Sequence, residues 1–243
     1  MERRKFVITV TNQFCSMGRV IARRMSELLG VECYNEYIVK ETARRLCLPA
    51  DVVDQAEERS RKIQRDTVFP TLIQRLGDQT NETQNRIFRT QADIIKALAE
   101  KENCVIVGRC SDFVLDELDY AVHIYIYAPF SDRVGHCIKE LEIGEEAALR
   151  LVTEMEESRI AYHLNYTGFR PDDKSHKDIL IDSSLLGVEG TAQLLTHMVR
   201  QKFQLPANER FARIADSRYI ACPYGVKRPE TMNSPGANSS FCF

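Results

Sequence analysis

Residues 12–18 combine polar and small side chains in a setting that favours anion binding. The run before them, residues 5–11 (KFVITVT), is apolar and β-branched and suits a buried strand. Residues 20–22 (VIA) open a helical pattern that ends near Gly30. Backbone N–H groups at a helix start, together with a tight loop, form an anion site. The order strand, loop, helix therefore predicts such a site at residues 12–18.

Further short apolar runs alternate with helical segments along the chain. The strand-like runs are residues 31–34, 104–107 (CVIV), 121–127 (AVHIYIY) and 178–181 (DILI). Helical spacing covers residues 36–47, 50–62, 83–101 and 188–203. This alternation predicts a three-layer α/β fold, a parallel sheet of about five strands with helices on both faces. Sites in such folds lie at the carboxyl ends of the strands, which here are residues 12–18, 108–109, 128–129 and 182–183.

The last part of the chain differs in composition from the rest. Residues 206–243 contain four of the eight prolines and end in a run rich in Asn, Ser and Gly. We therefore expect one domain over residues 1–205 and a weakly ordered or docked tail over residues 206–243. Within that tail, residues 218–222 (RYIAC) could add a strand. We also expect residues 60–82 to form a mobile helical flap.

Composition argues against several classes of partner. The formal net charge is only −2, which gives no bulk electrostatic reason to expect a nucleic acid or an anionic membrane. The eight cysteines form no C-x-x-C pair and have no zinc-like spacing with the five histidines, so no structural zinc site is expected. The chain lacks a signal-peptide pattern and any apolar run long enough to span a bilayer. We expect a cytoplasmic protein with reduced cysteines.

The first loop and its surroundings resemble those of the cytidylate kinase-like family. In that family a strand is followed by Q-F-G-S-G-G-R and by a helix that begins with an I-A pair. Here the loop reads Gln13, Phe14, Cys15, Ser16, Met17, Gly18, Arg19, and Ile21 and Ala22 follow. Further matches at the right spacing are Tyr34, Asn35, Tyr37, Gly108, Arg109, Asp112, Pro129, Arg133, Glu156, Arg159, Tyr162 and residues 166–168 and 178–184. The resemblance covers residues 5 to about 203.

The resemblance implies a P-loop kinase-type fold with a helical acceptor-binding flap and a lid. It also implies transfer of the γ-phosphoryl group of ATP, with Mg²⁺, to CMP, dCMP or a related nucleoside monophosphate. Such transfer needs mainly positive charge and alignment, without a protein nucleophile. The implied catalytic residues are Arg19, Arg133 and Arg159, and the implied donor site is the loop Gln13, Phe14, Cys15, Ser16, Met17, Gly18 and Arg19. The implied acceptor site comprises Tyr37, Arg89, Gln91, Arg109, Asp112, Glu156 and Arg159, and Ser16 would assist phosphates and water in holding Mg²⁺.

Several positions depart from the family pattern. Cys15 and Met17 replace glycines, which removes easy access to positive φ and places side chains where a phosphate would approach. Gly18 stands where the common motif G-x-x-x-x-G-K-[ST] has its lysine. Cys110 follows Arg109 where cytidylate kinases have an Asp that reads the base.

These departures leave a second interpretation open, a kinase fold that binds a nucleotide or another anionic ligand as a regulatory module. A dinucleotide-binding oxidoreductase is not favoured, because no G-x-G-x-x-G follows the first strand.

Overall fold

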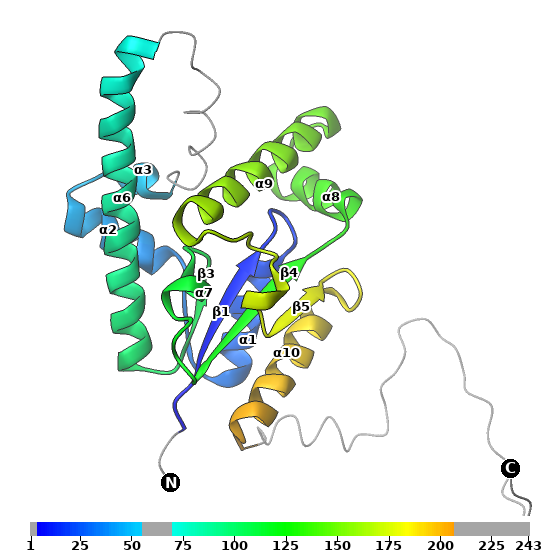
Figure 1. Cartoon of the computed structure of the whole chain (residues 1–243). Helices are drawn as coiled ribbons and strands as arrows, with labels where there is room; N and C mark the ends of the chain where they lie inside the picture. The colour runs from blue at the N-terminus through cyan, green and yellow to red at the C-terminus, as the bar shows by residue number, and fades with distance from the viewer. Residues whose placement is uncertain (1–3, 55–69, 207–243) are drawn as a thin grey trace, which may run out of the picture. The chain divides into compact units, whose positions relative to one another are not determined.

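The described part of the chain forms an α/β fold around one parallel sheet (Figure 1). The computed structural model describes residues 4–54 and 70–206, with side chains in the second range from Glu82 onward. The strands are β1 (Val7–Asn12), β2 (Glu32–Tyr34), β3 (Cys104–Val107), β4 (Ala121–Tyr127) and β5 (Ile179–Asp182). The helices are α1 (Gly18–Leu29), α2 (Glu36–Leu46), α3 (Ala50–Asp54), α6 (Pro70–Lys101), α7 (Ser111–Val114), α8 (Phe130–Leu141), α9 (Glu145–Thr167) and α10 (Gly187–Phe203), with a 3-10 turn η1 (Lys174–His176).

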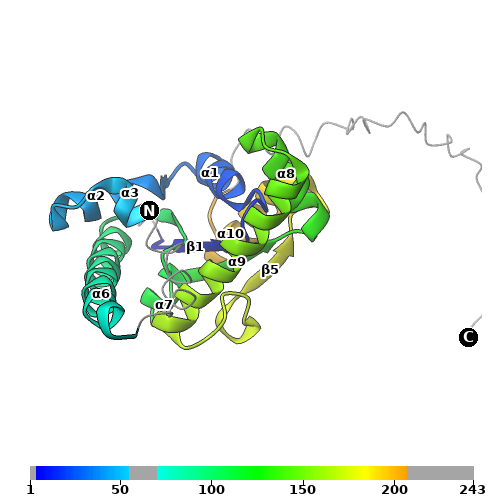
Figure 2. The same ribbon diagram turned by 90° about the horizontal axis from the view of Figure 1, so that it is seen from above.

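Strand β1 lies at the centre of the sheet, whose order is β2-β3-β1-β4-β5. Val7 pairs with Cys104 on one side and Ala121 on the other, in parallel register. The continuous apolar run of β1 is buried, as expected for a strand covered on both faces. Helices α1 and α10 pack together on one face, α7 contacts β1 on the other, and α9 lies with α8 beyond the carboxyl ends of the strands (Figures 1 and 2). The predicted three-layer α/β fold is confirmed.

Helix α6 packs with α2 beside the β2–β3 side of the sheet (Figure 2). Ile94 and Ile95 of α6 share a buried cluster with Ile38 of α2 and Ile106 of β3. Helix α6 begins at Pro70, so it is longer than the helix predicted from residue 83. Three other expectations fall wholly or partly outside the described residues: the flap at residues 60–82, the helix beyond Asp54, and the tail with its segment 218–222.

The loop between β1 and α1 adopts positive φ at two residues that are not glycine. Cys15 has φ 57° and Met17 has φ 61°, so the expectation that replacing the glycines removes this conformation is wrong. Each such residue costs roughly 1–2 kcal/mol. Hydrogen bonds of the loop offset this cost: the Gln13 N–H donates to the Ile126 carbonyl at 3.0 Å, and the Ile21 N–H donates to the Met17 carbonyl at 3.0 Å.

Restoring glycine at one of these positions is expected to stabilise the protein. Met17→Gly removes the steric cost of the left-handed conformation, and the free energy of unfolding should rise by about 1 kcal/mol. The matched control is Met198→Gly, which places the same substitution inside helix α10 and should lower that free energy by about 1 kcal/mol. Urea unfolding of the two variants measures both changes. If Met17→Gly lowers the free energy of unfolding as much as Met198→Gly does, the backbone at Met17 is not strained.

Candidate functional site

Ser16 fastens the loop between β1 and α1 to the sheet. Its hydroxyl group lies 2.9 Å from the Gln13 carbonyl and 3.2 Å from the Ile126 carbonyl, to which it can donate. The Ser183 hydroxyl donates to the Ser16 carbonyl at 2.7 Å, which ties the loop to the end of β5. Gly18, two residues after Ser16, has no room for a side chain, because a Cβ atom there would lie 2.4 Å from the Cβ of Asn12. Glycine at the position of the missing lysine is therefore required by close packing.

A small pocket lies at the carboxyl ends of β1 and β3, where the fold class predicts a site. Three arginines from separate segments line it: Arg19 in the first turn of α1, Arg109 after β3, and Arg159 in α9. Glu156, one turn before Arg159, also lines it. Its volume is about 50 Å³, small for a nucleotide, so long side chains of the lining must move to admit one. The other lining residues are Thr11, Asn12, Asn35, Val107, Gly108, Cys110, Tyr125, Tyr162, His163 and Pro171.

Arg109 occupies a strained turn at the end of β3. Gly108, Arg109 and Cys110 have φ values of 68°, 61° and 52°, a left-handed run that only its first residue adopts freely. The buried guanidinium group of Arg109 donates to the carboxylate of Asp54 at 2.7 Å, and Asp54 is half exposed. Strain of this kind clusters at ligand sites, where surrounding structure holds it. The turn thus presents a buried cation at the pocket wall, with a solvent-facing carboxylate as its partner.

Glu156 connects the helix pair α8–α9 to the loop after β1. Its Oε2 accepts a hydrogen bond from the Phe14 N–H at 3.2 Å and one from Arg133 Nη1 at 3.3 Å. Arg133 also donates from Nε to the Ala128 carbonyl at 3.2 Å, and Arg159 lies over the Phe14 ring, 5.2 Å from its centre. A carboxylate oxygen on a loop N–H occupies the kind of position that a phosphate oxygen takes in an anion site.

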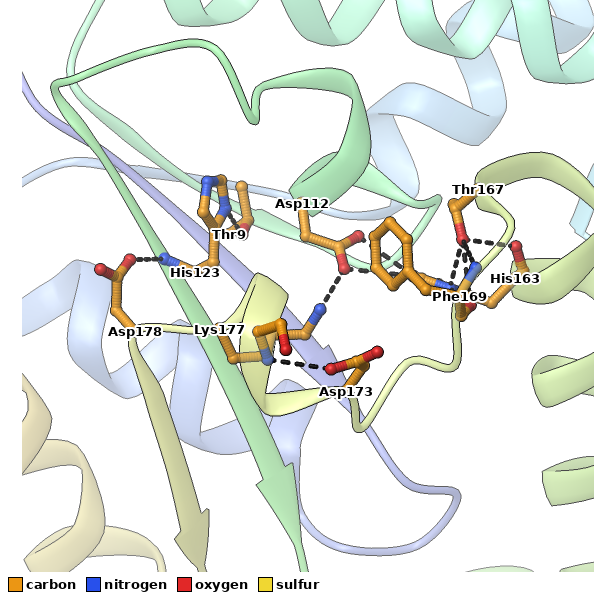
Figure 3. A network of polar contacts seen from close by, with 10 residues as sticks. Thr9, Asp112, His123, His163, Thr167, Phe169, Asp173, Lys177 and Asp178 are labelled. Atoms are coloured by element: carbon orange, nitrogen blue, oxygen red, sulfur yellow. Dashed lines mark hydrogen bonds and ion pairs between the residues drawn. The ribbon is translucent and has the colours of Figure 1, made fainter.

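Asp112 lies in a buried cluster of charged groups. It is 1% exposed, and its carboxylate contacts Lys177 Nζ and lies 3.1 Å from His163 Nε2 (Figure 3). Burial by itself raises the pKa of the Asp112 carboxyl, but the hydrogen bond and charge of His163 and the charge of Lys177 outweigh burial and hold that pKa well below its ordinary value. The carboxylate faces these two side chains, and Asp112 is not among the residues that line the described pocket. Its role as an acceptor ligand stays a prediction.

The remaining predicted residues lie in different surroundings. Tyr37 is 50% exposed on α2, and Arg89 is exposed on α6. Gln91 is buried on α6, and its amide atoms have no hydrogen-bond partner within the described residues. Together with Arg133, these residues do not line the pocket as it stands. Their roles stay predictions.

Two residues at the site have no signal in the sequence. His163 lines the pocket and contacts Asp112, yet its spacing gives no motif. Asp54 ends a short helix and pairs with Arg109, which lies 55 residues later in the chain. In the sequence, only the family resemblance pointed to the part of α9 around His163, because it matched Tyr162, the residue before it.

The thiol of Cys15 is not activated by its place in the loop. Burial raises its pKa to about 12, and the neighbouring Cys137 thiol adds to this shift. Because the thiolate is the reactive form, Cys15 is a poor nucleophile in this structure.

The residues that the structure describes do not form a metal site of their own. They contain no group of three His, Cys, Asp or Glu side chains that could hold a metal ion. Ser16, the predicted Mg²⁺ ligand, is fully buried, with its hydroxyl group on loop carbonyls. The role of Ser16 beside phosphates and water in holding Mg²⁺ stays a prediction. Among the described helices, none is long and apolar enough to cross a membrane.

Comparisons with known proteins agree with this architecture. The sequence model of the cytidylate kinase-like family matches residues 7–185. None of the curated proteins matches the chain. A solved structure of an uncharacterized protein from Eubacterium ventriosum is similar over 83% of this chain and 100% of its own, at 20% identity and a TM-score of 0.57. At that identity the likeness supports the fold alone.

Two shikimate kinase structures are also similar to the chain, at TM-scores below 0.5. The enzyme from Bacteroides thetaiotaomicron has 9% identity and a TM-score of 0.49, and covers 80% of this chain and 98% of its own. The enzyme from Acinetobacter baumannii, solved in complex with shikimate, has 12% identity and a TM-score of 0.43, and covers 82% of this chain and 93% of its own.

Proposed function

The chain belongs to the cytidylate kinase-like family, and we propose that it transfers the γ-phosphoryl group of ATP to CMP, dCMP or a related nucleoside monophosphate. One observation carries the proposal: Arg19, Arg109 and Arg159 line one pocket at the carboxyl ends of β1 and β3. Phosphoryl transfer spreads negative charge over the equatorial oxygens, and catalysis depends on positive charge and alignment. Arginines from three segments supply both without a nucleophile.

Each arginine has a place in this proposal that follows from its position. Arg19 is in the first turn of α1, beside the loop after β1, and would bind the donor phosphates. Arg109 would bind the acceptor phosphate, since a planar guanidinium can hold two oxygens at once. Arg159 on α9 lines the same pocket and would contact the transferred group, while Arg133 would support Arg159 through Glu156.

Binding of a triphosphate requires a change at Glu156. Its carboxylate now accepts from the Phe14 N–H, and a phosphate beside that group would meet a like charge. We propose that α9 moves when the donor binds, so that Glu156 leaves the loop while Arg159 stays at the pocket. Closure of α8 and α9 over the ligand would also exclude water, which strengthens each charge interaction at the site. Mg²⁺ would enter only as part of the nucleotide complex, where it neutralises phosphate charge.

The second candidate function is a nucleotide-binding or anion-binding module without transfer. The observation that favours it is the loop itself, which has Gly18 in place of the lysine and a glutamate on one of its N–H groups. A kinase would bind ATP and a nucleoside monophosphate, whereas a binding module would take one anionic ligand.

The cytoplasmic location and the domain boundary after residue 205 stay predictions.

Calorimetric titration with ATP and then CMP, in magnesium buffer, tests both functions. Arg19→Ala should weaken ATP binding about tenfold, because it removes a charged hydrogen-bond donor. The matched control is Arg23→Ala, which removes a largely exposed arginine one turn further along α1 and should leave ATP binding unchanged. A coupled assay with several monophosphates then measures turnover. Binding without turnover supports the module, and the absence of ATP binding in the wild type overturns the kinase proposal.

A further inference from the structure

Cys15, in the loop after β1, lies against the interface between helices α8 and α9. These two helices lie side by side (Figures 1 and 2). They share a buried cluster made of Val134, Cys137, Ala148 and Val152. Cys15 and the preceding Phe14 pack against this cluster. The loop of the proposed donor site is therefore in contact with the two helices that would move when the donor binds.

The thiols of Cys15 and Cys137 are in direct contact. The two side chains hydrogen-bond to each other, and both residues are free cysteines. A second contact holds the same segments together, because Nδ1 of His136 on α8 lies 3.0 Å from the Cys15 carbonyl. A disulfide requires two cysteines whose backbones are close and whose side chains face each other. These contacts place Cys15 and Cys137 in such an arrangement.

Exposure decides which of the two thiols an oxidant meets first. Cys15 is half-buried, whereas Cys137 is 0% exposed. With a small disulfide such as glutathione disulfide, the Cys15 sulfur loses its proton and attacks one glutathione sulfur, and the first glutathione leaves and takes up that proton. The Cys137 sulfur then loses its proton and attacks the Cys15 sulfur, and the second glutathione leaves in the same way. The two cysteine sulfurs together give two electrons to glutathione disulfide.

The surroundings of Cys15 make this bond slow to form and stable once formed. Burial, with a contribution from Cys137, raises the pKa of Cys15 to about 12, so little thiolate is present at neutral pH and the first attack is slow. A pair of thiols resists oxidation when one of them is held as a thiolate, and this pair lacks that stabilisation. The site therefore suits a response to prolonged oxidation.

We propose that Cys15 and Cys137 form a reversible disulfide when a small-molecule disulfide oxidises the protein, and that this bond holds the loop after β1 against α8 and blocks ATP binding. The block rests on the proposed function, in which Glu156 leaves the Phe14 N–H when a triphosphate binds. A covalent bond at the residue after Phe14 keeps the loop on the helix pair. Because the family pattern has glycine at the position of Cys15, the site belongs to this chain and not to the family pattern.

The first test incubates the full chain in mixtures of reduced and oxidised glutathione until the products no longer change. Acid quenching, digestion and mass spectrometry then quantify the peptide that joins Cys15 to Cys137. We expect this linked peptide in the wild type and its loss after treatment with dithiothreitol. The control Cys47→Ser removes an exposed thiol and should give the linked peptide to the same extent. If the wild type gives no linked peptide at equilibrium with oxidised glutathione, the inference is overturned.

The second test is calorimetric titration of the linked wild type with ATP, before and after reduction. We expect the linked protein to bind ATP at least about tenfold more weakly, because the arrangement that binds is then rarely populated. Reduction should restore the affinity. Cys15→Ser should bind ATP equally well after oxidising and reducing treatment. An unchanged affinity in the linked wild type, or an equal loss on oxidation in Cys15→Ser, would overturn the inference.

A measurement without ligand separates this inference from the proposed function. A bond between Cys15 and Cys137 closes a long loop in the unfolded chain, so the linked wild type should unfold at a higher urea concentration than the reduced wild type. Cys137→Ala cannot form the bond and should show no such rise after the same treatment. A linked wild type without this rise refutes the inference whether or not ATP binds. If the reduced wild type fails to bind ATP, the proposed function fails, and the linked peptide and the urea midpoint still decide whether the disulfide holds the loop on α8.

Discussion

Lys177→Met is expected to lower the free energy of unfolding by about 3–5 kcal/mol, because it breaks a buried ion pair on one side only. The Lys177 side chain is fully buried and that of Asp112 is 1% exposed. Without the ammonium group, the carboxylate keeps His163 as its one remaining ion-pair partner within the described residues. A buried polar network in which some groups lack partners lowers stability more than apolar side chains of the same shape would. Urea unfolding at neutral pH measures the loss.

A matched control and a pH series separate the buried pair from a general effect of the substitution. Lys40→Met breaks an exposed pair with Glu36 and should cost less than about 1 kcal/mol. Because the pKa of Asp112 is lowered in the folded state, its ionisation contributes stability above about pH 4 that is lost as the pH falls. The difference between wild type and Lys177→Met should therefore narrow in acid. Equal losses in the two lysine variants would contradict the role of the buried pair.

Arg109→Ala is expected to weaken CMP binding about 10- to 100-fold while changing ATP binding little. The guanidinium group is the buried cation at the end of β3, and its loss removes up to two charged hydrogen bonds to the acceptor phosphate. Arg109→Lys should lose most of the same affinity, because an ammonium group is a point charge without the planar fork. Calorimetric titration of each variant with CMP in the presence of a non-hydrolysable ATP analogue measures the change.

Asp54 supplies the control for Arg109. Its carboxylate lies 2.7 Å from the guanidinium group and competes with a phosphate for it. Asp54→Asn should leave CMP affinity unchanged or raise it, because the competing charge is gone. If Asp54→Asn and Arg109→Ala weaken CMP binding equally, the pair serves the structure of the turn, and Arg109 is not the acceptor ligand.

Local sequence patterns were sufficient for the fold class. Apolar runs such as residues 104–107 and 121–127 became β3 and β4 within the bounds predicted, because continuous burial requires apolar side chains at each position. Because these apolar runs alternate with helical segments, a parallel sheet covered by helices is the compact arrangement that buries them. Helix bounds were less predictable: α6 begins 13 residues before the predicted start, at Pro70, a residue that a first helical turn tolerates.

The loop after β1 shows where local preference fails. Residue types at Cys15 and Met17 disfavour positive φ, yet both adopt it. The deciding contacts come from elsewhere in the chain, since Ser16 bonds a carbonyl 110 residues later and receives a bond from Ser183, 167 residues later. A strain of about 1–2 kcal/mol per residue is smaller than the sum of such contacts. Propensity is a weak guide where the surrounding structure determines the backbone.

The sequence by itself determined the sheet and, through the spacing of a family, the arginines Arg19, Arg109 and Arg159 that line the pocket at its carboxyl edge. Periodic burial and motif spacing are local properties of the chain. Only the tertiary structure decided which groups hold those arginines and which charges are buried. Asp112 meets His163 and Lys177 across 51 and 65 residues of sequence, and Glu156 meets the Phe14 N–H across 142. Electrostatic and hydrogen-bond energies depend on distances in space, and no local pattern encodes such distances.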